Sequence, residues 1–181
     1  MKKTFLLFLF FGTLVYGYHY DDLLLKAQAS IFPKIMLLDK KLKNKLIDGK
    51  IIYTVVYDKN DYRSALNVSD FIDENHKGHF DKYEYQVNLV EFTDLSDETQ
   101  ASAIYALNSN QYIEKVAEIA KKKGIIAFAY DISNLKNGFL FSLMLEKSAV
   151  LYLNKENLYT QQVDFVESLF QIVKFLNANG R

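Results

Sequence analysis

Short runs of apolar and β-branched residues recur along the chain at the length of β-strands. The run at 51–57 is the richest in β-branched and aromatic residues, which favour strands. The run at 83–92 alternates apolar and polar positions, as in a strand with one exposed face. The pattern predicts four strands in the first 130 residues: 51–57, 83–92, 103–107 and 125–130.

The stretch from Asn137 to Asn154 predicts two further strands joined by a tight turn. Asn137-Gly138 opens it, and the polar Glu146-Lys147-Ser148 marks the reversal. Its first arm is apolar at nearly every position, which is typical of a strand covered on both faces. We therefore expect an antiparallel hairpin near the C-terminus.

Apolar residues at helical spacing flank these strands. The first helix is predicted over about 23–38, because acidic residues precede it and apolar residues follow every three or four positions. Pro33 lies inside this pattern and must either kink the helix or split it near Phe32. A second helix is predicted to start at Asp58 and to continue through Ile72.

Two more helices are predicted in the second half. Asn108-Ser109-Asn110 is expected to cap a helix over 113–123, and the lysines before Gly124 indicate where it ends. The final helix is predicted over 161–176, with Thr160 as its cap. Its apolar residues form more than one stripe.

Strands that alternate with helices imply a mostly parallel sheet covered on both faces. We expect an α/β fold, a three-layer Rossmann-like sandwich whose sheet is mostly parallel, with the C-terminal antiparallel hairpin followed by a terminal helix. With 181 residues and no internal linker or repeat, the chain predicts a single domain over residues 18–181.

The first 17 residues have the layout of a secretory signal peptide. Lys2 and Lys3 precede a short apolar run, and Val15-Tyr16-Gly17 provides a small residue at the expected cleavage site. An uncleaved membrane anchor is the alternative, since Val15 is large for this position. No Cys follows the run, so the chain is not predicted to be a lipoprotein. We expect the mature protein, from Tyr18 onward, in the periplasm.

Charge argues against nucleic-acid binding. The chain has 22 basic and 22 acidic residues, and removal of Lys2 and Lys3 leaves an acidic excess. A phosphate backbone requires a basic surface, which this composition does not provide.

Few residues suggest catalysis, and we predict no enzyme activity, no cofactor and no metal site. The seven Gly form no phosphate-binding loop, and Cys is absent from the chain. His76 and His79 lie near several acidic residues, but a polar surface turn is the favoured interpretation over a metal site. Asp131 follows a buried strand, where a crevice residue could lie, although capping of the next turn is favoured.

The first and last predicted helices carry more apolar residues than one buried face needs. The excess could cover a partner or a second copy of the chain, or both helices could simply pack on the sheet and on each other. The candidate partner or dimer surface consists of Leu24, Ile31, Phe32, Ile35, Phe165 and Phe170.

The order of elements resembles the YfiR-like family of small periplasmic signalling regulators. Leu25-Lys26-Ala27 and Phe32-Pro33-Lys34-Ile35 match the family's opening helix, and three later segments match its closing strands and helix. These segments are Gly138-Phe139-Leu140-Phe141, Leu151-Tyr152-Leu153-Asn154 and Ser168-Leu169-Phe170-Gln171-Ile172. The Trp-Pro that usually ends the family's first helix is absent, and without Cys the redox response described for the family's best-known member cannot operate here.

The resemblance implies a non-catalytic periplasmic regulator that binds and restrains the periplasmic domain of an inner-membrane signalling enzyme. The usual target is a diguanylate cyclase, so the output would be cyclic-di-GMP signalling; a histidine kinase is another candidate partner. The alternative is a periplasmic small-molecule-binding module that feeds a histidine kinase or a transporter. That alternative requires a concave site lined by tyrosines at strand positions, such as Tyr53, Tyr57, Tyr105 and Tyr130.

Overall fold

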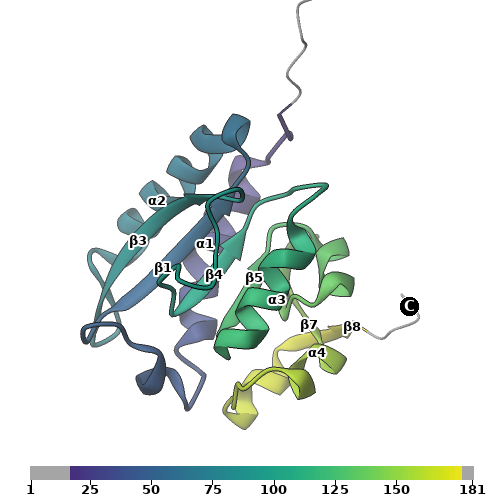
Figure 1. Cartoon of the computed structure of the whole chain (residues 1–181). Coiled ribbons are helices and arrows are strands. Elements are labelled where there is room, and N and C mark those ends of the chain that lie inside the picture. The colour runs from purple at the N-terminus through teal and green to yellow at the C-terminus, as the bar shows by residue number, and fades with distance from the viewer. Residues whose placement is uncertain (1–16, 177–181) are drawn as a thin grey trace, which may run out of the picture.

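The computed structural model describes residues 17–176, which form an α/β fold around one eight-stranded sheet (Figure 1). The strand order is β2-β3-β1-β4-β5-β6-β7-β8. The strands are β1 (Ile51–Tyr57), β2 (His79–Phe80), β3 (Tyr83–Glu91), β4 (Ala103–Ala106), β5 (Ile126–Ala129), β6 (Phe141–Leu145), β7 (Ala149–Asn154) and β8 (Val173–Leu176). The helices are α1 (Asp22–Met36), α2 (Tyr62–His76), α3 (Ile113–Lys123) and α4 (Lys155–Thr160). Short 3₁₀ segments are η1 (Leu42–Lys45), η2 (Lys59–Asp61), η3 (Ile132–Asn137) and η4 (Glu167–Gln171).

Most of the sheet is parallel, as predicted. Strands β3, β1, β4, β5 and β6 run in one direction. The predicted hairpin is present: β6 and β7 pair antiparallel, with Leu145 opposite Ala149 at the turn. The structure also adds β2, antiparallel to β3, and β8, parallel to β7.

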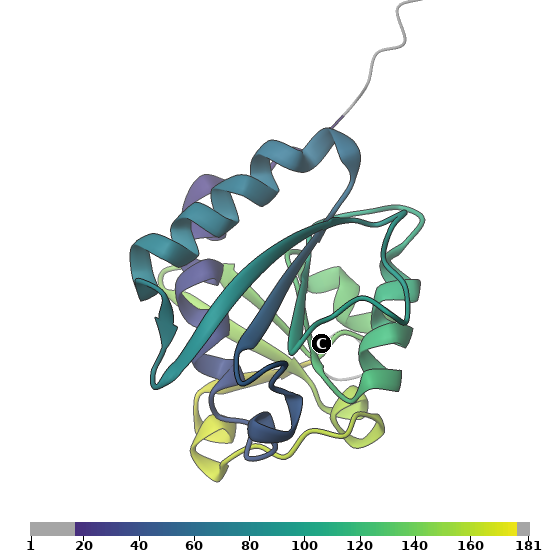
Figure 2. The same cartoon turned by 60° about the vertical axis from the view of Figure 1, so that its left-hand side comes forward.

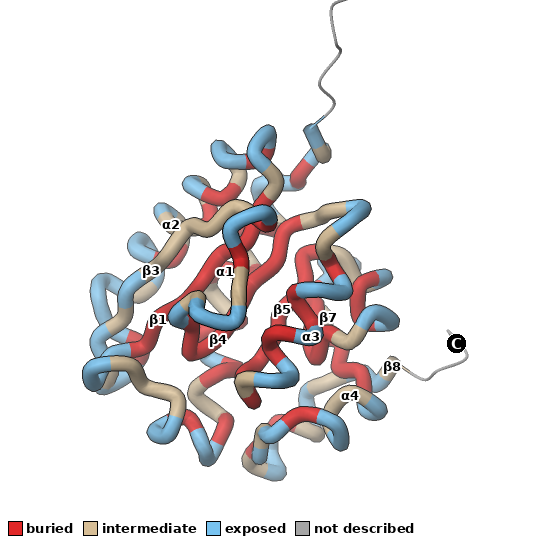
Figure 3. The backbone as a smooth tube through the Cα atoms, in the orientation of Figure 1, coloured by how far each residue is buried: buried red, intermediate tan, exposed pale blue. Residues whose placement is uncertain are grey.

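Helices cover both faces of the sheet, which confirms the predicted three layers. Helices α1 and α2 lie side by side on one face, and α3 and η3 lie on the other (Figure 2). Each face has its own apolar cluster, because alternate residues of β1 point to opposite sides: Val55 joins the α1 and α2 cluster, and Val56 joins the α3 cluster. Figure 3 shows the result as buried central strands within helices that are exposed on their outer sides.

Helix α1 continues through Pro33 to Met36, so the predicted split near Phe32 does not occur. Proline lacks the N–H that would bond the carbonyl of Ala29 four residues earlier. His76 of α2 lies in its place, with Nε2 3.3 Å from the Ala29 oxygen, where the ring can donate the missing hydrogen bond. The neighbouring helix therefore satisfies the group that proline leaves without a partner.

The predicted terminal helix over 161–176 is wrong. Helix α4 begins earlier, because the Asn154 side chain accepts from the N–H groups of Glu156 and Asn157 and caps it. The chain then turns into η4 and ends in strand β8. The apolar residues that were too many for one helical stripe pack instead as a loop, a 3₁₀ turn and a strand.

The cap predicted for α3 is also wrong in part. Tyr112 is the residue before the helix, and none of the side chains of Asn108-Ser109-Asn110 caps it. The predicted stop is confirmed, since Gly124 has a φ of 64°, in the left-handed region that glycine adopts without strain.

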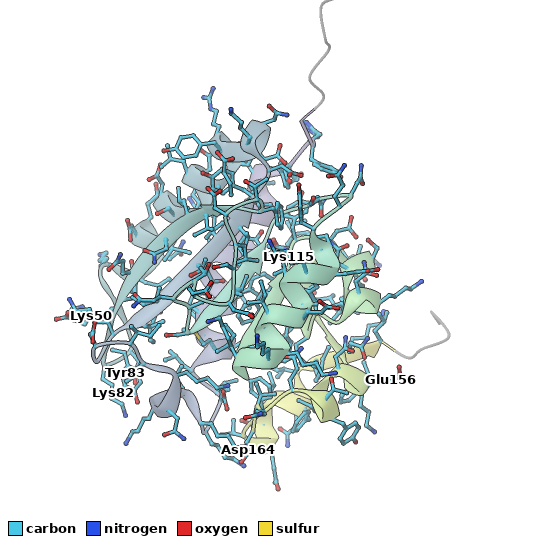
Figure 4. All side chains as sticks on the ribbon, viewed as in Figure 1. Lys50, Lys82, Tyr83, Lys115, Glu156 and Asp164 are labelled. Atoms are coloured by element: carbon cyan, nitrogen blue, oxygen red, sulfur yellow. The ribbon has the colours of Figure 1, made fainter. Side chains whose placement is uncertain are left out.

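The segment after α4 is tied to the amino end of the sheet by Asp39. This buried carboxylate accepts the backbone N–H groups of Lys41 and Asp164, and Lys45 Nζ lies 2.5 Å from its Oδ2. Figure 4 shows Asp164 at the bottom of the molecule. One charged group thus joins the end of α1, η1 and the C-terminal segment.

Candidate functional site at the carboxyl end of the sheet

The strand order reverses between β1 and β4. From β1 the chain crosses to β3 on one side, and from β4 it crosses to β5 on the other. In open α/β sheets, ligands bind outside the carboxyl ends of the two strands at such a point, which here are Tyr57 and Ala106. In this chain the N-terminal segment, residues 17–21, lies there.

The N-terminal segment is held by hydrogen bonds to three different parts of the fold. The hydroxyl of Tyr20 donates to Asp61 Oδ2 at 2.9 Å and accepts from the backbone N–H of Asn108 at 3.0 Å. The Asp21 N–H donates to the Tyr130 hydroxyl at 2.9 Å, and the Tyr20 ring packs edge-on against the Tyr130 ring at 4.8 Å. The segment therefore bridges the ends of β4 and β5 and the start of α2.

Asp61 is the buried acidic residue to which the N-terminal segment is hydrogen-bonded. Its side chain accepts from the Tyr18 backbone N–H at 3.2 Å and from the Tyr20 hydroxyl, and the residue is 3% exposed. Burial raises the pKa of the Asp61 carboxyl, the hydrogen bonds from Tyr20 and Tyr18 partly offset this, and the charge of Asp58 raises it further. Within residues 17–176, no lysine, arginine or histidine lies within salt-bridge distance of Asp61.

Burial and the neighbouring carboxylate also raise the pKa of the Tyr20 hydroxyl, so it stays protonated as a donor. Beside this network is an open hollow of about 250 Å³. Its lining residues are Tyr18, Asp58, Ser109, Asn110, Gln111 and Tyr112. At the carboxyl ends of β1 and β4, residues 17–21 thus fill the crevice, and a small hollow lies next to them.

Further along the same end of the sheet, the surface is apolar. Gln28 of α1 donates to the Leu143 carbonyl of β6 at 3.0 Å. Leu24 lies one helical turn before Gln28, about 5 Å along the axis of α1. Leu145 lies two strand residues, or about 7 Å, beyond Leu143. Leu24 and Leu145 are therefore at a similar height at this end of the sheet. The register of β8 with β7 places Ile172 beside Val150, at the start of β7.

We call Leu23, Leu24, Leu145 and Ile172 the apolar rim. Eight large hydrophobic side chains are classed as exposed in the described part of the chain, and three of them belong to the rim. Leu23 is 72% exposed, Leu145 43% and Ile172 62%. Leu24 packs against the cluster under α1 and α2, whereas Val150, beside Ile172, packs against the cluster under α3, so the rim follows the end of the sheet rather than one face. Exposed apolar side chains gathered at one end of the sheet are candidates for partner binding.

The partner surface predicted from sequence is divided by the structure. Phe32, Ile35 and Phe165 are buried in the core at 0%, 4% and 4% exposure, so their side chains do not form an open surface. Phe32 stacks on Phe128 at 4.5 Å, which explains why this side of α1 faces the sheet. The other three predicted residues, Leu24, Ile31 and Phe170, are half-buried against the same core, and their part in an interface stays a prediction.

The tyrosines proposed for a ligand pocket are also core residues. Tyr53 and Tyr105 are fully buried, and Tyr57 and Tyr130 are less than a tenth exposed. Asp131 caps η3 by accepting from the Ser133 N–H, as the favoured interpretation expected. His76 packs against Phe80, and in the described residues no three metal-ligating side chains gather around it or elsewhere.

Sequence reasoning missed Asp61 and Tyr20. Asp61 looked like one of several polar residues after a strand, and Tyr20 like part of a polar start to the mature chain. The crevice rule could have selected Asp61, since it lies four residues beyond the carboxyl end of β1, at the reversal of strand order.

Comparisons with known proteins give the fold only. No protein-family model and no curated protein sequence matches the chain. A conserved domain protein from Vibrio cholerae O1 biovar El Tor is similar in structure, with a TM-score of 0.57, 14% identity, and coverage of 83% of this chain and 59% of that one. The ABC domain from Streptococcus pneumoniae in complex with L-Trp has a TM-score of 0.51, 11% identity, and coverage of 78% and 60%.

This chain therefore spans about three fifths of the length of these two solved structures. Both neighbours are under 25% identical, and the likeness concerns the α/β fold. Among residues 17–176, none of the helices has the length and apolar character needed to cross a membrane.

Proposed function

We propose that the protein is a non-catalytic regulator, exported to the periplasm, that binds and restrains the periplasmic domain of an inner-membrane signalling enzyme. The preferred partner is a diguanylate cyclase, with a histidine kinase as the other candidate. The partner class comes from the resemblance to the YfiR-like family. The observation that carries the proposal is the apolar rim, in which Leu23, Leu145 and Ile172 are exposed at the same end of the sheet on three separate segments.

A partner that covers the rim would remove exposed apolar area from water, which contributes about 25 cal/mol per Å². Leu24 lies beside the exposed Leu23 and belongs to the rim, so part of the surface expected from sequence remains in this proposal. The signal would act by changing the fraction of the regulator that occupies the partner.

The test is in-cell crosslinking of the tagged full-length chain, followed by identification of the captured protein. We expect a membrane-bound cyclase or kinase, and we expect Leu145→Asp or Ile172→Asp to reduce its capture at least tenfold. The matched control is Tyr159→Asp on α4, a residue that is 76% exposed and follows the opposite end of β7. Capture of a second copy alone, or of a transporter component, would contradict the proposal.

Small-molecule binding is the second candidate, and the hollow beside Tyr18 and Tyr112 is the observation in its favour. At about 250 Å³ it is smaller than most ligand pockets, which span about 300–1,000 Å³. L-tryptophan, which the streptococcal neighbour binds, is a suitable first probe. A saturable calorimetric signal that Tyr112→Ala abolishes would favour this candidate over the regulator.

A further inference from the structure

We propose that Asp61 is the binding site for the protein's own mature N-terminus: hydrolysis of the Gly17–Tyr18 peptide bond creates an ammonium group at Tyr18, which forms an ion pair with the Asp61 carboxylate. The inference rests on the export assumed in the proposed function. In the cleavage step a signal peptidase adds one water across the bond. Gly17 leaves as a carboxylate, and the new Tyr18 amine takes up a proton.

The atom that would carry the charge is already in place. The Tyr18 nitrogen lies 3.2 Å from Asp61 Oδ1 while it is still an amide that donates one hydrogen. Tyr20 and Asp21 hold the following residues through their bonds to Asp61, Asn108 and Tyr130. Cleavage therefore needs no rearrangement of the N-terminal segment to bring the ammonium to the carboxylate.

Among residues 17–176, Asp61 also has no cationic side chain to pair with its carboxylate. In the uncleaved chain the residue is 3% exposed, with Gly17 next to its Oδ1, and its hydrogen-bond donors, the Tyr20 hydroxyl and the Tyr18 amide, are neutral. The nearby Asp58 adds a second negative charge. An ammonium at Tyr18 would supply a positive charge and up to three donors at a distance already suited to a hydrogen bond.

Gly17 fits this arrangement because it has no side chain. A Cβ at position 17 would lie 3.2 Å from Asp61 Oδ1, closer than an ordinary van der Waals contact. The small residue that a signal peptidase requires before the cleaved bond is thus also the residue that the buried carboxylate accommodates in the precursor.

The test is a cycle of four proteins that begin at Tyr18: free amine or N-acetyl, each with Asp61 or Asp61→Asn. The acetyl group takes the place of the Gly17 carbonyl and Cα, so it restores the amide of the precursor. In urea unfolding at neutral pH, we expect acetylation to raise the unfolding equilibrium constant about tenfold or more with Asp61. In the Asp61→Asn background we expect a change of less than about threefold, because the pairing charge is absent.

An equal effect of acetylation in both backgrounds would overturn the ion pair. If Asp61→Asn does not fold, the wild-type pair of proteins still decides, since equal stability of the free and acetylated chains would also overturn it. N-terminal sequencing of the exported protein tests the cleavage, and any start other than Tyr18 would overturn that part. None of these measurements involves the apolar rim or a partner, so they can fail independently of the proposed function.

Discussion

Two aspartates at opposite ends of the sheet have the same burial and different partners. Asp39 and Asp61 are each 3% exposed, and each receives two hydrogen bonds from donors other than lysine side chains. Asp39 also has Lys45, whose Nζ lies 2.5 Å from Oδ2 and whose side chain is itself only 9% exposed. Asp61 has no side-chain cation within salt-bridge distance in residues 17–176.

The difference suggests two ways in which one fold can pair a buried carboxylate with a cation. At the amino end of the sheet, the sequence supplies the cation from η1, six residues after Asp39. At the carboxyl end, the covalent event that produces the mature chain would supply it. The Asp39 site is therefore complete once the chain folds, whereas on our proposal the Asp61 site would be completed by cleavage.

The largest effect is expected at the complete site. Asp39→Asn leaves Lys45 buried without its counter-charge, so we expect a loss of about 3–5 kcal/mol in the free energy of unfolding. Urea denaturation measures it. The exposed pair of Lys40 with Asp164 is the control, and Lys40→Ala should cost no more than about 0.5 kcal/mol. Similar losses for the two variants would show that Asp39 and Lys45 are not a buried pair.

The next effect concerns the hydroxyl that joins the N-terminal segment to Asp61. Tyr20→Phe removes the donor to Asp61 and the acceptor for the Asn108 N–H, so we expect a loss of about 1–3 kcal/mol. Tyr159→Phe, at a residue that is 76% exposed, should change stability by less than about 0.5 kcal/mol. A neutral Tyr20→Phe would mean that the segment is not bound as described.

His76 provides a smaller test, away from both aspartates. His76→Ala leaves the Ala29 carbonyl beside Pro33 without a donor, and we expect a loss of about 1–2 kcal/mol, while the exposed His79→Ala should be nearly neutral. Thermal denaturation of the two variants compares them directly. Equal stability would show that proline in α1 needs no such donor.

The same histidine predicts a pH dependence. Burial lowers the pKa of His76 below its ordinary value of 6.5, so between the two pKa values the unfolded chain binds more protons. This contribution to stability is present above 6.5 and is lost as the pH falls through the pKa of the folded state. Stability profiles of wild type and His76→Ala should converge at low pH.

The smallest effect is expected for Asp61→Asn in the acetylated chain. Because the pKa of Asp61 is raised when Tyr18 is an amide, the carboxylate destabilises the folded state as the pH rises through that pKa. The neutral amide of asparagine removes this cost, so at pH 7 we expect no loss of stability in urea denaturation. A large loss would mean that Asp61 already has a sufficient partner.

The regular part of the fold could be predicted from local patterns. Strand β1 matches the predicted 51–57 residue for residue, and the β6–β7 hairpin and the stop at Gly124 were also predicted correctly. The segment after Thr160 could not, because its apolar residues are divided between the core and an edge strand by contacts with distant elements. Periodicity alone does not distinguish such a segment from a wide helical face.

The candidate site was less predictable than the fold. Asp61 is buried because Tyr18 and Tyr20, about forty residues earlier, lie over it. Phe165 was predicted to be available for a partner, but its ring packs against that of Phe141 at 5.4 Å. These two residues are far apart in the sequence, so local patterns do not reveal the contact. The burial of both residues depends on long-range contacts, which hydrophobic patterning does not encode.

Titration of the Tyr18 α-amine by NMR in the mature chain tests the central claim most directly. An unpaired N-terminal amine has a pKa of about 7.7–8.0, and an ion pair with buried Asp61 should raise it by about one unit or more. In the Asp61→Asn chain the same amine should titrate near its ordinary value. An ordinary pKa in the wild-type protein would show that Asp61 does not bind the mature N-terminus.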